Sequence, residues 1–298
     1  MSPRPIIHFV AGLPRSGSTL LLNLLGQHPN HHVTPTNGLL GLVAGVQQSW
    51  TTIEPFVAQG LKKVEPRIAA TLRAMFYGFY ERELGSGQVV FDKNRGWTSQ
   101  IELLEVVFNR QVPIICPIRD VKAIIASFEK LHRSAPIARR HYLGPNYLQA
   151  QTIQGRAEVL LAPAGVVGRS VAQLRDALNR GTADRLVLVP YRSLTMHPME
   201  TLQQLHVRLG LPHEEGVYDP NRIEQITQED DALYGWGHQL HAVKSKVEPA
   251  SGVPWEGVLP PHVCQWIDHQ VPDINQLTMS VAGSAEGGAG CRPIDPRE

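Results

Sequence analysis

The stretch from residue 6 to residue 29 constrains the fold most, because it combines a short apolar run, a glycine-containing loop and a leucine-rich segment. Residues 6–10 are rich in β-branched side chains and predict a buried strand. The loop that follows contains Gly12 and Gly17, and the segment after it has helical spacing up to Gly26. A strand, a glycine loop and a helix in this order aim several backbone N–H groups and a positive helix end at one anion. The sequence therefore predicts an α/β fold with a phosphate or sulfate site at this loop.

The loop differs from that of nucleoside triphosphatases. Its spacing from Gly12 to Thr19 matches the frame G-x-x-x-x-G-K-[ST], but Ser18 stands where the lysine belongs. A nucleoside triphosphatase uses that lysine on the outer phosphates, usually with magnesium. The cation of this loop is Arg15, and we expect its side chain to lie over the bound anion.

A second anion site is predicted after another apolar run, residues 112–118. Arg119 ends that expected strand, and Ser127 follows eight residues later, two turns into the next expected helix. The two side chains then share one helix face. A guanidinium can bind a phosphate through two parallel hydrogen bonds, and a hydroxyl adds one more.

A further strand is expected over residues 88–91, and it ends at Asp92 and Lys93. Ligands of open α/β sheets bind beyond the carboxyl ends of the strands, so Lys93 is expected to point toward the anion. Asp92 can instead be interpreted as a metal ligand, which is the strongest form of a kinase hypothesis.

These motifs resemble a known family. The loop Pro-Arg-Ser-Gly-Ser-Thr at residues 14–19, the helix after it and the closing His-Pro at residues 28–29 resemble the 5′-phosphosulfate loop of sulfotransferases that use 3′-phosphoadenylyl sulfate (PAPS). The tyrosylprotein sulfotransferases and their bacterial relatives are the most similar branch. The pair Arg119 and Ser127 resembles the 3′-phosphate signature of the same family. The resemblance implies a P-loop-type parallel β-sheet flanked by helices, in one domain over residues 1–281 with helical insertions.

The resemblance also implies roles for individual residues. Arg15 and Lys93 are the expected catalytic cations at the transferred group. The expected contacts of the nucleotide are Pro14, Arg15, Ser16, Gly17, Ser18, Thr19, Arg119, Ser127, Tyr191, Lys244 and Lys246.

The proton acceptor is harder to place. The glutamate that serves this role in tyrosylprotein sulfotransferases aligns with Pro35 and Thr36. His31 and His32 lie in what we expect to be a polar loop over residues 31–38, and histidine accepts protons near neutral pH. They are the candidate substitutes.

Two further stretches are expected to lie outside the hydrophobic core. Residues 132–163 are basic and aperiodic, which fits either a solvated surface excursion or a lid that recognises the acceptor. Residues 282–298 are rich in Gly, Ala and Ser and are expected to form a disordered tail.

Composition excludes several classes of partner. A net charge of +1 argues against a nucleic-acid binder that relies on bulk electrostatics. The three cysteines are widely spaced, lack zinc-site spacing and are odd in number, which favours a reducing compartment. The sequence shows no apolar leader and no apolar run of membrane length, so we expect a cytoplasmic protein without a membrane partner.

The hypothesis from the sequence is a sulfotransferase that moves a sulfuryl group from PAPS to a hydroxyl or amine of a small molecule, without a metal. A protein-tyrosine sulfotransferase is weaker because the acidic base is missing. A P-loop kinase that uses ATP and magnesium, and a nucleotide-binding module without catalysis, are the alternatives from other classes. The acceptor, the general base and the oligomeric state stay open at this point.

Overall fold

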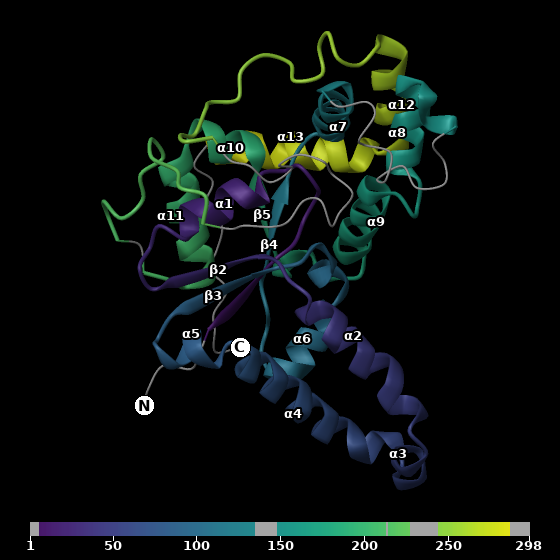
Figure 1. Ribbon diagram of the computed structural model, residues 1–298, viewed down its shortest axis with the longest axis vertical. Helices are drawn as coiled ribbons and strands as arrows, with labels where there is room; N and C mark the ends of the chain where they lie inside the picture. Colours follow the sequence, from purple (N-terminus) through teal and green to yellow (C-terminus); the bar gives the residue numbers. More distant parts are fainter. Residues whose placement is uncertain (1–5, 135–147, 213, 227–243, 287–298) are drawn as a thin grey trace.

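The computed structural model describes residues 6–134, 148–212, 214–226 and 244–286, with side chains placed up to residue 281. Within these ranges, five parallel strands form one sheet in the order β2-β3-β1-β4-β5. The strands are β1 (Ile7–Val10), β2 (His31–Thr36), β3 (Val89–Lys93), β4 (Ile114–Ile118) and β5 (Leu186–Pro190). Helices flank this sheet, which confirms the predicted α/β class (Figure 1).

Successive strand residues alternate between two hydrophobic cores, one on each face of the sheet. Phe9 packs into one core and Val10 into the other, and Val90 and Phe91 divide in the same way. One face is covered by α1 (Ser18–Leu25), α10 (Tyr191–Met196) and α11 (Pro198–Leu209). The other carries α6 (Ile101–Phe108), α7 (Val121–Ser134), α8 (Ile153–Leu161), α9 (Val166–Asn179), α12 (Pro261–Gln270) and α13 (Pro272–Glu286).

An arm of helices projects from this body, as Figure 1 shows. It consists of α2 (Leu39–Ser49), α3 (Glu54–Gln59) and α4 (Leu61–Phe79), and α5 (Glu81–Gly85) follows it. Tyr80 has a non-helical backbone, which separates α4 from α5. Short 3₁₀ turns complete the described elements: η1 (Trp50–Thr52), η2 (Arg95–Ser99), η4 (Gln149–Gln151) and η5 (Ala183–Arg185).

The expected polar loop over residues 31–38 is wrong for its first six residues, which form strand β2. This strand lies at the edge of the sheet and pairs on one side with β3. An edge strand tolerates a proline because its outer N–H groups need no ladder partner. Pro35 lies in the interval between Val33 and Thr36, where the register shifts.

Two other expectations change at their boundaries. Helix α13 continues to Glu286, so the tail does not begin at residue 282, and residues 287–298 lie outside the described ones. Within the basic stretch 132–163, α8 packs into the core through Ala157 and Leu160, while residues 135–147 also lie outside the description. In the described part of the chain, no helix combines the length and apolarity needed to cross a membrane.

Candidate functional site

The glycine loop is held against the carboxyl end of β4. The N–H of Ala11 donates to the carbonyl of Ile115 at 2.8 Å, and that of Leu13 donates to the carbonyl of Pro117 at 3.2 Å. Gly12 has a φ of +100°, and a Cβ at this position would lie 2.4 Å from the Pro117 oxygen. The close approach of the two backbones therefore requires glycine.

Arg15 connects the two predicted anion sites. Its Nε donates to the hydroxyl of Ser127 at 3.1 Å, and its own carbonyl accepts from Nη1 of Arg119 at 3.1 Å. Arg15 also has a φ of +57°, a left-handed conformation that a non-glycine residue adopts at a cost. The structure thus brings Arg15, Ser127 and Arg119 into one cluster, although more than a hundred positions separate the loop from the other two.

Tyr191 closes this cluster from the end of β5. The guanidinium carbon of Arg119 lies 4.1 Å from the centre of the Tyr191 ring, a cation–π arrangement. A Cβ at Gly17 would lie 2.7 Å from the same ring, so the tyrosine packs directly on the loop. Burial lowers the pKa of Arg119, and the neighbouring Tyr191 and Asp120 oppose that shift.

The N-terminus of α1 presents its unpaired backbone N–H groups at the loop. Gly17 is the N-cap residue and contributes no side-chain hydrogen bond, and the first turn contains no acidic residue. Ser18 and Thr19 are the first two helical residues. The buried Ser16 donates its hydroxyl to the carbonyl of Leu13 at 2.5 Å, which holds the loop closed on itself, next to the buried Pro14. No acidic side chain in this turn neutralises the positive end of the helix, which therefore suits an anion.

Lys93 ends β3 beside this loop. The register pairs it with Val10, the last residue of β1. Because it follows Phe91 by two positions, it lies on the sheet face that α1 covers. Its N–H donates to the hydroxyl of Thr34 at 3.0 Å, and its carbonyl accepts from the N–H of Asn37 at 3.2 Å.

Asp92 lies on the opposite face and is fully buried. Its carboxylate accepts hydrogen bonds from Asn37, Tyr80 and Trp97, so that both oxygens have protein partners. The interpretation of Asp92 as a kinase metal ligand is therefore wrong, because the carboxylate is enclosed and already bonded. Sequence reasoning missed the three donors. They lie 55, 12 and 5 positions from Asp92, and no motif joins them.

The structure contradicts a catalytic role for His31 and His32. Both begin β2 and pair with Val89 and Val90 at the start of β3, so they lie at the amino end of the sheet, away from the loop. His31 contacts the carbonyl of Leu25 at 3.0 Å and stacks on another histidine ring, and burial lowers its pKa to about 4. His32 lines a surface pocket at this end of the sheet. The order of residues after His-Pro did not reveal which end of a strand they would occupy.

Lys244 and Lys246 flank Ser245, whose backbone pairs with Ile223. Lys244 forms an ion pair with Glu248, and the carbonyl of Ser245 accepts from the N–H of Ile223 at 2.7 Å. The segment that includes Ile223 is in turn held by the side chain of Gln27, just past the C-terminus of α1. A nucleotide contact by either lysine stays a prediction. Two further histidines that could accept a proton, His238 and His241, lie outside the described residues.

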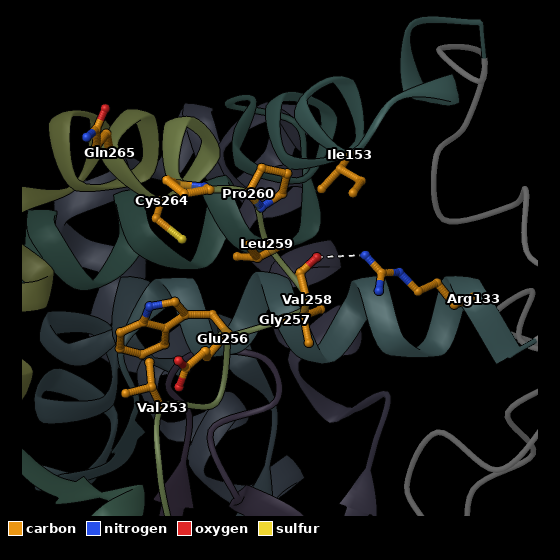
Figure 2. A pocket seen from close by; sticks show the side chains of 12 residues that line it. Arg133, Ile153, Val253, Glu256, Gly257, Val258, Leu259, Pro260, Cys264 and Gln265 are labelled. Atoms are coloured by element: carbon orange, nitrogen blue, oxygen red, sulfur yellow. Dashed lines mark hydrogen bonds between the residues drawn. The ribbon is translucent and has the colours of Figure 1, made fainter.

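A cavity of about 760 Å³ lies away from this cluster, between α7, α8, α12 and the segment that precedes α12 (Figure 2). Its walls are mainly apolar, and Arg133 at its rim donates to Glu129 and to the carbonyl of Val258. Arg133 follows Ser127 by six residues, about 120° around the helix from the hydroxyl that contacts Arg15. The cavity lining includes none of Arg15, Arg119, Ser127 and Tyr191, so it is separate from their cluster.

Comparison with known proteins identifies the family. Residues 5–215, which contain the loop, Lys93, Arg119, Ser127 and Tyr191, match the model of the sulfotransferase family. The chain belongs to this family. A similar curated relative is nodulation protein NoeE of Sinorhizobium fredii, which is 27% identical over 234 residues. The match covers 75% of this chain and 52% of NoeE, so the chain spans about half the length of that relative.

Solved structures with a similar course of the chain are also sulfotransferases. The sulfotransferase domain of the olefin synthase of Synechococcus PCC 7002 is 20% identical, with a TM-score of 0.48 over 98% of this chain and 96% of that one. The sulfotransferase STF9 of Mycobacterium avium is 16% identical, with a TM-score of 0.46 over 91% of this chain and 77% of that one.

Proposed function

We propose that this sulfotransferase takes its sulfuryl group from PAPS and transfers it to a hydroxyl or amine of a small molecule. The observation that carries the proposal is the chain of hydrogen bonds from Ser127 through Arg15 to Arg119. It places an arginine–serine pair directly against a glycine loop at a helix N-terminus. An adenosine with phosphates at both its 3′ and 5′ positions has two anionic groups that suit these two neighbouring sites.

Each side chain has a distinct task in this proposal. The N–H groups of residues 16–19 hold the 5′-phosphosulfate, as helix N-termini hold anions in general. Arg119 and Ser127 hold the 3′-phosphate. Tyr191 lies beside the nucleotide and fixes the plane of the Arg119 guanidinium through its ring.

The transfer step is an in-line displacement in which the acceptor oxygen or nitrogen forms a bond to sulfur while the bond from sulfur to the bridging oxygen breaks. Negative charge develops on that bridging oxygen as the bisphosphate leaves. Arg15 and Lys93 are the cations that stabilise this charge, by positioning and electrostatics as in phosphoryl transfer. The acceptor must also release a proton.

Calorimetry tests the donor. We expect adenosine 3′,5′-bisphosphate to bind without magnesium and more tightly than ATP. Magnesium-dependent binding of ATP without binding of the bisphosphate would contradict the proposal. Sulfuryl transfer from radiolabelled PAPS, measured across a panel of small hydroxyl and amine compounds, then tests the reaction and identifies the acceptor class.

A further inference from the structure

Both ends of the helical arm meet at one buried carboxylate. The arm leaves the sheet directly after Asn37 and returns to it at Tyr80. The side chains of these two residues converge on Asp92 of β3, next to Lys93. In Figure 1 the arm projects from the body. The cluster joins the residue two positions before α2 to the residue that follows α4.

The contacts at the base enclose the Asp92 carboxylate, and of its three donors Tyr80 and Trp97 are buried and Asn37 is half-buried. Nδ2 of Asn37 lies 2.7 Å from Oδ2 of Asp92, and the hydroxyl of Tyr80 donates to the same oxygen. Nε1 of Trp97 donates to the other oxygen at 2.7 Å. The exposed fractions of Asp92, Tyr80 and Trp97 are 0%, 2% and 0%. Four segments, namely the β2–α2 junction, the end of α4, β3 and η2, are therefore tied together at one group.

The presence of an acidic group at this position is not explained by stability. All three donors are neutral, and a carboxylate buried among neutral donors costs more than an apolar side chain of the same size. Burial raises the pKa of Asp92, which reflects the same cost. A buried polar network does, however, specify one arrangement of the segments that it joins.

The same network reaches the backbone of Lys93. Asn37, held through its side chain by Asp92, donates its N–H to the Lys93 carbonyl at 3.2 Å. The carbonyl of Asn37 accepts from Nδ2 of Asn94 at 3.0 Å. Asn37 is thus bonded to Asp92 and to the two residues that follow it, Lys93 and Asn94. A shift of Asn37 would move the backbone that carries the Lys93 ammonium.

We infer that Asp92 is a positioning residue, which fixes the base of the arm and the backbone of Lys93 in one arrangement. Its effect on turnover rests on the proposed function, because it acts through Lys93. Its role in fixing the base of the arm does not depend on that function.

Two variants and a matched control test this inference. Asp92→Asn keeps the shape but turns an amide N–H₂ toward one of the donors, and Tyr80→Phe removes one donor. Tyr218→Phe is the control, because its phenol is also buried and donates to or accepts from His206 at 3.0 Å, in the core under α1 and α11. We expect Asp92→Asn to lower kcat about 10- to 100-fold, the cost of a misplaced catalytic group. The Kd of adenosine 3′,5′-bisphosphate should change by less than about twofold. Tyr80→Phe should also lower kcat and leave this Kd nearly unchanged, with a smaller effect on kcat than Asp92→Asn has.

Hydrogen exchange gives a readout that does not depend on catalysis. Exchange in the first turn of α2 and the last turn of α4 should rise in Asp92→Asn and Tyr80→Phe but not in Tyr218→Phe. Unchanged kcat and unchanged exchange in folded Asp92→Asn would overturn the inference, and so would a parallel loss of kcat and bisphosphate affinity. If Asp92→Asn does not fold, Tyr80→Phe decides by the same criteria. If the wild-type protein neither binds the bisphosphate nor transfers sulfuryl groups, the proposed function fails, whereas exchange at the arm still decides the role of Asp92.

Discussion

Lys93 shows how the place of a residue in a strand can bring it to a candidate site. It ends β3 beside the glycine loop and is 5% exposed. Lys93→Met keeps most of the side-chain volume and removes the charge. We expect turnover to fall about 100-fold, because one donor to the developing charge is lost. Single-turnover measurements with radiolabelled PAPS check this result.

The same variant should bind adenosine 3′,5′-bisphosphate as the wild type does. Lys130→Met is a suitable control, since the exposed ammonium of Lys130 donates to the carbonyl of Pro254 on another part of the surface. Loss of bisphosphate binding with an intact rate for the bound donor would show that Lys93 holds the nucleotide instead.

Arg119 is expected to act on binding. Its guanidinium lies between the Arg15 carbonyl and the Tyr191 ring. A guanidinium can bind a phosphate through two parallel hydrogen bonds. Arg119→Ala should weaken bisphosphate binding by about 2 kcal/mol, or some 30-fold, the range of charge-assisted hydrogen bonds. Titration calorimetry measures the change. Arg175→Ala, which removes an exposed ion pair with Asp273, should leave the affinity unchanged, and an equal loss in both variants would contradict a specific role for Arg119.

At the scale of the element, the backbone contact between the glycine loop and β4 makes a sharp prediction. A Cβ at Gly12 would lie 2.4 Å from the Pro117 oxygen, at a φ that side chains disfavour. Gly12→Ala should therefore lower the free energy of unfolding by about 2 kcal/mol or more. Urea denaturation measures this change.

Gly45 provides the matched comparison for Gly12. It lies inside α2, and a Cβ there would meet no atom within 4 Å. Gly45→Ala should raise the free energy of unfolding by about 0.5–1 kcal/mol, because alanine loses less backbone entropy in a helix. Equal effects of the two substitutions would show that the loop has room for a side chain.

The elements that the sequence predicted well are those with local rules. The course from β1 through the loop to α1 is encoded in contiguous residues. Strand β2 was missed because its two histidines and Pro35 suggest a loop. Its strand character comes from pairing with β3, which lies more than fifty positions away.

The residues of the candidate site likewise divide into those with a local sequence signal and those without one. The spacing of Arg119 and Ser127 was informative because a strand end and a helix face fix it locally, and the fold then brings the pair to Arg15. The cluster around Asp92 has no such signal, since its donors come from separate elements. His31 and His32 were misassigned because proximity in sequence to the loop does not give proximity in space when a helix lies between them.

At the scale of the whole molecule, the parallel sheet separates two environments. The loop after β1, Lys93, Arg119 and Tyr191 all follow the carboxyl ends of strands. The amino ends, in contrast, carry a buried group of aromatic rings that includes His8 and His31. The proposed chemistry thus lies at one end of the strands, while the histidines at the other end are expected to make stability depend on pH.

His8 and His31 are expected to destabilise the fold in acid. Burial lowers the pKa of His8 to about 3 and that of His31 to about 4, from an ordinary value of 6.5, and Arg110, His28 and His206 add repulsion. Between those values and 6.5 the unfolded chain binds protons that the folded chain does not. Stability is therefore complete above pH 6.5 and declines as the pH falls toward 4.

Substitution of His8 isolates its share of this decline. Its Nε2 is buried without a hydrogen-bond partner among the described residues, so His8→Leu removes both a proton-binding group and an unsatisfied polar atom. The free energy of unfolding should lose about 1–2 kcal/mol less between pH 6.5 and 5 in this variant than in the wild type. Urea denaturation at several pH values measures the difference, with His262→Gln as a control at an exposed position of α12. Identical pH profiles for His8→Leu and the wild type would mean that His8 is protonated in the folded protein as readily as in the unfolded chain, and that the amino end of the sheet is open to water.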